Sequence, residues 1–386
     1  MHVAQVSFFR DRQDRPPAAL LRAWPSLVDV AGAAARTGLE VTVVQASRQD
    51  AVFEQDGVTV HFVGAARSPK WIWEPVKNLQ SAGAVVSHLR QLRPDVIHVH
   101  GLGFPFQTGM VSRRLPAVPI LVQDHANRVP VGWRARAFRI GHARISGTAF
   151  TSSEQASQFV AKGLFGPGIR VFEVAESSSH FTPGDQLQAR RELTVKGDPC
   201  VAWIGRMNAN KDPLTVLAAF RAAAPRLKDP HLWCCYTDVS LLRAARSAAE
   251  NDPVLAGRVH FLGELPHERV EVLLRAADFL MLGSHVEGSG FAVIESLACG
   301  TPPLVTDIPS FRKLTGHGRV GALSPPGDSE AMARALLEWT ARPRGASRAM
   351  ARRHFEAELS FEAIGQRLRV AYDTLGKHHR RPKSLE

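Results

Sequence analysis

Cysteine is scarce in this sequence, and long hydrophobic runs are missing. The 386 residues include 4 cysteines without a C-x-x-C pair, which argues against a disulfide framework or a zinc site. No apolar stretch reaches the roughly 18 residues that a membrane-spanning helix needs. The opening segment MHVAQVSFF runs directly into charged residues and has no apolar region typical of a secretory signal. We therefore expect a cytoplasmic protein with buried, reduced thiols.

Acidic residues are too few to balance the basic ones, and the net charge is +12 at pH 7. An excess of this sign predicts anionic partners, namely nucleotide diphosphates, anionic lipid or nucleic acid. The charge is spread along the chain without a nucleic-acid motif, so we expect no nucleic-acid partner. With 45% hydrophobic residues, the chain is long enough to bury two domain-sized cores.

Residues 284–307, SHVEGSGFAVIESLACGTPPLVTD, form the stretch around which the chain is organised. The pattern predicts a buried strand over residues 278–283, a helix over 292–299 that ends at Gly300, and a strand over 304–306. Strand–loop–helix–strand units of this kind bind ligands at the carboxyl ends of their strands.

Two glutamates, Glu287 and Glu295, form an E-x7-E pair in this stretch. The start of the helix offers unpaired N–H groups and a partial positive charge to a phosphate. Glu295 lies inside the helix, where its carboxylate can accept hydrogen bonds from vicinal hydroxyls such as those of a ribose. The alternative interpretation is that both carboxylates are solvated surface groups.

The first half of the chain alternates strand-like and helical segments. Residues 3–9 and 41–45 predict strands on either side of a helix over residues 20–36, and residues 52–63 predict a hairpin that turns at Asp56-Gly57. Similar alternation continues through the second half. Alternating strands and helices indicate α/β structure with parallel sheets.

Four segments resemble one family. SHVEGSGFAVIESLACGTPPLVTDIPSFR, WIGRMNANKDP, DVIHVHG and VQDH are similar to the motifs of the group 1, or family 4, retaining glycosyltransferases. The resemblance implies the GT-B fold, an α/β architecture in which two Rossmann-like domains with parallel sheets face each other across a cleft. It implies an acceptor domain over residues 1–180, a donor domain over 181–358, a helix over 359–376 that returns to the first domain, and a basic tail over 377–386.

The resemblance assigns catalysis to Arg206, Lys211, Glu287 and His125. Arg206 and Lys211 flank a glycine turn and could neutralise the charge that develops on a diphosphate leaving group; the alternative is that they are surface cations. The resemblance assigns donor binding to Gly205, Leu265, Gly288, Ser289, Gly290, Phe291, Ala292 and Glu295.

The acceptor side is predicted at Arg10, His100 and Gly101. Where the family has a glycine pair after the first strand, this chain has Arg10, Arg12 and Arg15, which suggests an anionic acceptor; a solvated loop is the alternative. His98 and His100 lie two residues apart on a strand and point to one face. A metal site is the alternative for this pair, but it lacks an adjacent third ligand.

The segment 128–146 is basic and is interleaved with Trp133, Phe138 and Ile140. Such a helix can lie on an anionic membrane surface, so we expect peripheral contact with the inner face of the membrane. The alternative is an ordinary amphipathic helix that packs on the sheet.

Together these features predict a retaining, metal-independent glycosyltransferase without a cofactor. It would move a sugar from a nucleotide-diphosphate sugar, a UDP-sugar in preference to a GDP-sugar, to a saccharide, lipid-linked or small-molecule acceptor. With no obvious carboxylate nucleophile, the displaced phosphate would take the acceptor proton. The alternatives are a non-catalytic nucleotide-sugar-binding protein and a GT-B epimerase.

Overall fold

The chain folds into two compact units. The first consists of Met1–Ser177 together with Phe361–Glu386, and the second of Ser178–Ser360. This division comes from a computed structural model that describes residues 1–11, 13, 15–64, 74–125 and 127–379.

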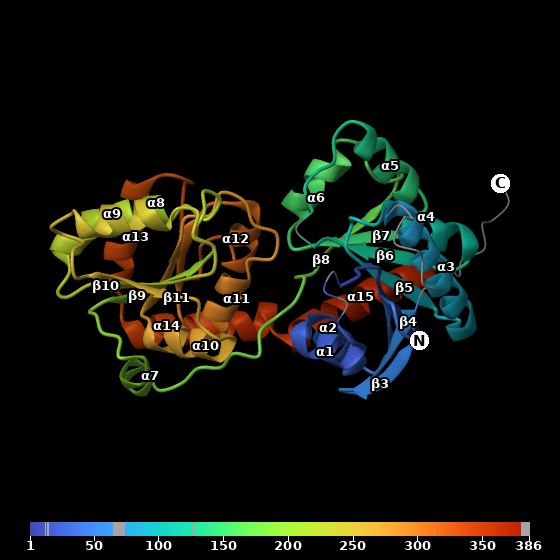
Figure 1. Ribbon diagram of the computed structural model, residues 1–386, viewed down its shortest axis with the longest axis horizontal. Helices are drawn as coiled ribbons and strands as arrows, with labels where there is room; N and C mark the ends of the chain where they lie inside the picture. Colours follow the sequence, from blue (N-terminus) through green and yellow to red (C-terminus); the bar gives the residue numbers. More distant parts are fainter. Residues whose placement is uncertain (12, 14, 65–73, 126, 380–386) are drawn as a thin grey trace. The chain divides into compact units, whose positions relative to one another are not determined.

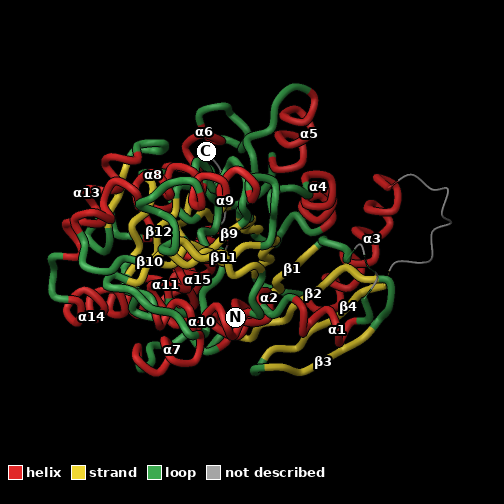
Figure 2. The backbone as a smooth tube through the Cα atoms, turned by 60° about the vertical axis from the view of Figure 1, so that its left-hand side comes forward, coloured by secondary structure: helices red, strands yellow, loops and turns green. Residues whose placement is uncertain are grey.

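The first unit is built on an eight-stranded sheet, within the described residues, in which only the edge strand β3 runs antiparallel to its neighbour. Valine-rich strands such as β1 are buried on both faces because helices cover them. Figure 2 shows β1, β2, β4 and β3 side by side. The strand order is β3 (Ala51–Gln55), β4 (Val58–Gly64), β2 (Glu40–Ser47), β1 (His2–Ser7), β5 (Val96–His100), β6 (Ile120–Gln123), β7 (Gly147–Phe150) and β8 (Arg170–Glu173).

The second unit is built on a six-stranded, wholly parallel sheet. Its core gathers large apolar side chains, among them Trp203, Phe220, Phe279 and Phe311. The strand order is β11 (Val259–Gly263), β10 (His231–Tyr236), β9 (Cys200–Gly205), β12 (Phe279–Leu282), β13 (Pro303–Thr306) and β14 (Ala322–Ser324).

Helices cover both faces of each sheet. Figure 1 shows α8, α9 and α13 on one side of the second sheet and α10 and α14 on the other. The helices of the first unit are α1 (Pro17–Ala23), α2 (Ser26–Ala35), α3 (Glu74–Leu92), α4 (Pro105–Arg114), α5 (Trp133–His142), α6 (Ser153–Val160) and α15 (Phe361–His379). Those of the second unit are α7 (Gln186–Leu193), α8 (Pro213–Ala223), η1 (Ala224–Arg226), α9 (Leu242–Glu250), α10 (His267–Ala276), α11 (Phe291–Ala298), α12 (Pro309–Leu314), α13 (Ser329–Thr340), α14 (Arg344–His354) and η2 (Phe355–Leu359).

Both sheets reverse their strand order at one point. In the second unit the order, counted along the chain, is 3-2-1-4-5-6, with the reversal between β9 and β12; in the first unit the reversal lies between β1 and β5. Loops leave such a point in opposite directions, which opens a crevice at the carboxyl ends of the two central strands. The α/β class with two Rossmann-like parallel sheets is therefore confirmed.

The last helix, α15, belongs to the first unit. Gly365 permits a close approach to α2, because a Cβ at this position would lie 2.2 Å from the carbonyl oxygen of Ala33. The return of the C-terminal helix to the N-terminal domain is confirmed. The helix extends to His379, so it includes the first residues of the predicted tail, and residues 380–386 lie outside the described part.

The predicted single helix over residues 20–36 is wrong, since α1 ends at Ala23 and α2 begins at Ser26. Pro25 causes the break, because its ring and its missing N–H interrupt a continuous helix. The predicted hairpin is confirmed: β3 and β4 pair in antiparallel fashion, and Asp56 and Gly57 adopt φ values of 53° and 75°.

Candidate active site

In the second unit, two loops meet at the crevice between β9 and β12. The ammonium of Lys211 forms an ion pair with the carboxylate of Glu287, and the two side chains are only 15% and 13% exposed. The backbone N–H of His285 donates to the carbonyl of Asn210 at 2.8 Å, and the Asn210 side-chain amide donates to the Val286 carbonyl at 3.0 Å. Main-chain and side-chain contacts thus hold the predicted cation and carboxylate together.

Asp212 follows Lys211 directly, and its backbone is left-handed, with φ 41° and ψ 63°. An aspartate tolerates this conformation better than most residues because its short polar side chain bonds locally. Its carboxylate caps α8 by accepting from the Thr215 N–H at 3.1 Å and the Thr215 hydroxyl at 2.7 Å. It also lies 3.0 Å from Nε2 of His285. Asp212 therefore caps α8 and contacts the facing loop.

The predicted phosphate seat lies at the start of α11. Gly290 precedes the helix with φ 64°, and a Cβ there would lie 2.6 Å from Leu314. Gly288 and Ser289 come directly before it and are half-buried, as is Ala292, while Phe291 is 39% exposed. The left-handed backbone thus favours glycine at the point where the helix presents its first N–H groups.

Glu295 lies one helical turn into α11 and contacts Nε2 of His267 at 2.7 Å. This hydrogen bond raises the pKa of His267 above its ordinary value of 6.5. His267 begins α10, two residues after Leu265, which packs in part against the core. The Glu295 carboxylate therefore has a protein partner at the position where a ribose is predicted.

Arg206 follows β9 directly, and its side chain is exposed. It lies beside Asp238, whose pKa is lowered chiefly by hydrogen bonds from Ser240 and Asn208 and to a smaller extent by the charge of Arg206. Gly205 lies against Lys211, since a Cβ on this glycine would be 3.5 Å from Cδ of the lysine. The structure thus joins Lys211 to Glu287, and it places Arg206 next to Asp238.

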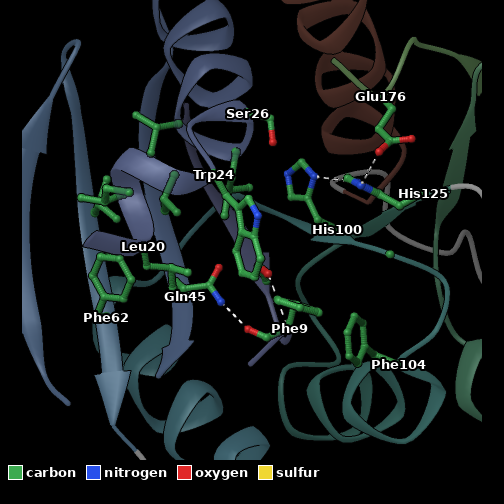
Figure 3. Close-up of a pocket in the computed structure, with 17 residues that line it drawn as sticks. Phe9, Leu20, Trp24, Ser26, Gln45, Phe62, His100, Phe104, His125 and Glu176 are labelled. Carbon is green, nitrogen blue, oxygen red and sulfur yellow. Dashed lines mark hydrogen bonds and ion pairs between the residues drawn. The ribbon is translucent and has the colours of Figure 1, made fainter. Parts of the chain in front are cut away.

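In the first unit, a hydrogen-bonded row of side chains connects β1, β5 and the segments that follow β6 and β8. Figure 3 shows its members His100, His125 and Glu176. Nε2 of His100 lies 3.0 Å from Oε1 of Gln5, and Nδ1 of His100 lies 3.2 Å from Nε2 of His125. Nδ1 of His125 lies 3.1 Å from a carboxylate oxygen of Glu176. Both ring nitrogens of His125 therefore have partners, and Glu176 was not predicted from the sequence as a site residue.

The row continues into the core at Tyr372 of α15. Gln5 Nε2 donates to the Tyr372 hydroxyl at 3.1 Å, and this hydroxyl lies 2.7 Å from Nδ1 of His98. The rings of His98 and His100 are 4.3 Å apart, which confirms that they share one face of the strand. Burial lowers the pKa of His98 to about 3 and holds that of His100 well below 6.5.

A pocket of about 280 Å³ adjoins this row. Gly101 lines it with φ 97°, a conformation that favours glycine, and a Cβ there would lie 3.2 Å from the ring of Phe104. Arg10 lines a separate, neighbouring hollow together with Arg15. Arg15 is bound to Asp11 at 2.8 Å and stacks on Trp24 at 4.4 Å, whereas Arg12 lies outside the described residues.

The sequence also predicts buried, reduced cysteines and no metal site. Cys200, Cys234, Cys235 and Cys299 are free and buried, and burial raises the pKa of Cys200 and of Cys299 to about 12. In the part of the chain that the structure describes, no group of three or more His, Cys, Asp or Glu side chains could hold a metal ion. Across the same residues, no helix combines the length and apolar character needed to cross a bilayer.

Comparison with known proteins decides the family. A family model described as "Glycosyl transferases group 1" matches residues 185–354, and one described as "Glycosyl transferase 4-like domain" matches residues 23–175. The chain is 30% identical over 383 residues to a D-inositol 3-phosphate glycosyltransferase of Geodermatophilus obscurus, covering 90% of this chain and 83% of that protein. The chain belongs to the group 1 glycosyltransferases.

Other relatives of this glycosyltransferase differ in the reactions that their names state. This chain is 26% identical to a 2-deoxystreptamine N-acetyl-D-glucosaminyltransferase of Streptomyces fradiae, and the match covers 81% of this chain and 83% of that protein. Among solved structures, the Anabaena protein HepE in complex with UDP superposes with a TM-score of 0.71 at 16% identity, covering 97% and 100% of the two chains. HepE was also solved with UDP-glucose, with a TM-score of 0.66 at 17% identity over the same shares. These likenesses support the GT-B fold of this glycosyltransferase.

Proposed function

We propose that this glycosyltransferase retains anomeric configuration and uses a nucleotide-diphosphate sugar. The observation that carries the proposal is the half-buried ion pair of Lys211 and Glu287 beside the glycine-led start of α11. A cation and a helix N-terminus at one strand edge suit a diphosphate. The UDP and UDP-glucose complexes of HepE favour a UDP-sugar over a GDP-sugar.

Each donor group has a proposed partner. Lys211 and Arg206 neutralise charge on the leaving diphosphate, and Glu287 holds the ammonium of Lys211 next to Gly205. The N–H groups at residues 288–292 bind phosphate oxygens, and main-chain atoms at Leu265 bind the base. Glu295 accepts hydrogen bonds from the ribose hydroxyls, which compete with its contact to His267.

The acceptor side is proposed at His125, His100 and Gly101, with Arg10 nearby. The His125–Glu176 pair orients the acceptor hydroxyl, and the displaced phosphate removes its proton as the hydroxyl attacks from the same face. The glycosidic bond to the diphosphate breaks and the bond to the acceptor oxygen forms on that face, so the configuration is kept. No metal or organic cofactor takes part in this proposal.

Contact with an anionic membrane remains a separate proposal, carried by α5. Trp133 and Ile140 are 73% and 53% exposed beside exposed Arg134 and Arg136, whereas Phe138 is buried in the core. Apolar and cationic side chains on one exposed surface suit a headgroup region. Localisation at the inner face of the membrane, in the cytoplasm, rests on this proposal.

Donor screening tests the proposed function. Thermal-shift assays with UDP-, GDP- and ADP-sugars should show the largest stabilisation with a UDP-sugar, because a ligand that binds the folded state alone stabilises it. Proton NMR of the product should then show the donor's anomeric configuration. An inverted product, or a glycosyl adduct trapped on Glu287, would contradict the mechanism.

A further inference from the structure

The pocket beside His100 in the first unit has mostly apolar walls. Phe9 and Trp24 form one side, with ring centroids 5.0 Å apart in an edge-to-face arrangement. Leu20 and Phe62 form another, and Phe104 a third (Figure 3), and Val43 also lines the pocket. We call this hollow the Trp24 pocket. A pyranose carries hydroxyls around its ring and needs polar partners on several sides, which these walls do not supply.

The polar side chains that line the Trp24 pocket are Ser7, Ser26, Gln45, His100, His125 and Glu176, and the three ionisable ones gather at one end. His100, His125 and Glu176 lie together there, and Figure 3 shows them above the aromatic side chains. Gln45 also lines the pocket, but its Nε2 donates to the carbonyl oxygen of Phe9, so it fixes the wall. A ligand that fits this distribution has a hydroxyl at one end and an apolar body behind it.

The walls are held in place before a ligand arrives. Trp24 sits at the break between α1 and α2 and is stacked under the guanidinium of Arg15, which Asp11 binds in turn. Although Phe9 and Trp24 are 43% and 41% exposed, each is fixed by a specific contact. Rigid aromatic side chains bind apolar surface with little loss of conformational freedom.

Size limits the apolar body. An apolar cavity of about 150 Å³ in another protein is large enough for benzene, so about 280 Å³ has room for one or two rings. Flat aromatic walls favour stacking and edge contacts with rings. A long alkyl chain would make few such contacts.

We propose that the acceptor of this enzyme is a hydroxyl compound with an apolar system of one or two rings. The rings occupy the Trp24 pocket, and the hydroxyl lies at the His125–Glu176 pair, where transfer takes place. This inference rests on the proposed function, since it names the acceptor class for the same reaction. It replaces the anionic acceptor suggested by the arginines of the first loop as the preferred substrate class.

Direct binding tests the proposal without turnover. Calorimetric titration of the full-length protein measures its affinity for three probes. They are 2-naphthol for an aromatic ring system, methyl α-glucopyranoside for a sugar and 1-octanol for an alkyl chain. We expect a dissociation constant for 2-naphthol at least about ten-fold below that of either other probe. Trp24→Ala should weaken naphthol binding about ten-fold, because it removes one aromatic wall. Equal or tighter binding of the glucoside, or of octanol, would overturn the assignment of a ring.

Matched variants show where the probe binds. Trp133→Ala removes another exposed tryptophan, from α5, and Phe106→Ala removes an exposed phenylalanine, from α4. Both controls should leave naphthol affinity within two-fold. Leu20→Trp fills the pocket and should abolish naphthol binding while the protein stays folded by circular dichroism. Undiminished naphthol binding in both Trp24→Ala and Leu20→Trp would overturn the proposal.

A parallel titration with UDP separates this inference from the proposed function. UDP binding without naphthol binding would overturn the acceptor class and leave the donor proposal intact. Naphthol binding without binding of any nucleotide would remove the proposed function, and with it the acceptor role of the pocket. Binding of both is the expected result, together with glycosylation of 2-naphthol when a UDP-sugar replaces UDP.

Discussion

At the scale of single residues, the chemistry proposed for the second unit rests on the ion pair of Lys211 and Glu287. Both side chains are largely withdrawn from water, so each depends on the other more than an exposed pair would. Removal of either partner leaves an uncompensated charge at the proposed diphosphate site. The losses of activity caused by removing Lys211 and by removing Glu287 should therefore not be additive.

We expect Lys211→Ala, Glu287→Ala and Arg206→Ala each to lower kcat/KM by about 100-fold or more, as for the loss of a transition-state contact. The double variant Lys211→Ala/Glu287→Ala should lose much less than the product of the single losses, because the residues act as a pair. Steady-state kinetics with the donor found by screening measures both. Glu330→Ala, from an exposed pair with Arg334, is the control. Near-normal turnover in the site variants would count against the assignment.

Asp212 allows a second test at this scale. Asp212→Ala keeps the left-handed backbone but removes the cap of α8, so it should reduce the free energy of unfolding by about 1–2 kcal/mol. Asp212→Gly also loses the cap, but it adopts positive φ freely and should be less destabilising than alanine. Urea unfolding measures the difference. If alanine proves more stable than glycine, backbone conformation is not what limits this position.

At the scale of elements, two features determine where the tryptophans Trp24 and Trp133 lie. They are the break between α1 and α2 and the packing of α5. Pro25 divides the first helical segment and leaves Trp24 at the pocket wall. Gly141 lets α5 approach α4, since a Cβ there would lie 2.1 Å from the carbonyl oxygen of Pro105. The same packing turns Phe138 inward and leaves Trp133 exposed.

The exposed side of α5 predicts binding to anionic vesicles. Arg134→Glu/Arg136→Glu should weaken sedimentation with phosphatidylserine vesicles by roughly ten-fold or more at low salt, since each basic residue contributes about 1 kcal/mol near such a surface. The double variant Arg243→Glu/Arg334→Glu makes the same charge change on α9 and α13 and should bind as the unaltered protein does. Equal losses in both variants would show that net charge alone governs binding.

At the scale of the whole molecule, buried histidines make the first unit sensitive to acid. His98, His100 and His142 are all buried in it, and burial lowers the pKa of His142 to about 4. Below the ordinary pKa near 6.5, the unfolded chain binds protons that the folded chain does not. Stability is therefore fully present above pH 6.5 and falls as the pH drops toward the folded-state values.

His142→Leu should remove one of these contributions. Between pH 7 and pH 4, the unaltered protein should lose roughly 3 kcal/mol more stability than the variant, from a shift between 6.5 and about 4. Urea unfolding across this pH range measures the loss. Phe165→Leu alters the same aromatic cluster without removing a titratable group, so its effect should be similar at every pH. An unchanged acid dependence in His142→Leu would contradict the prediction.

Local sequence was sufficient for the fold class and for the grouping of Lys211 with Glu287 in the candidate site of the second unit. Strand and helix periods, the turn at Asp56-Gly57 and the end of α11 at Gly300 follow from short-range sterics and hydrogen bonding. The contact of Lys211 with Glu287 could be predicted from the sequence, because both residues follow strands that flank a reversal of strand order.

The candidate site of the first unit depended on the tertiary structure. Glu176 meets His125, and Tyr372 meets His98, across long stretches of chain, and neither pairing has a local signal. The Trp24 pocket is lined by residues around the break between α1 and α2 and by residues of β1, β2, β4 and β5, which are neighbours in the sheet. Contacts of this kind follow from how the sheet is ordered in space, which residue spacing along the chain does not encode.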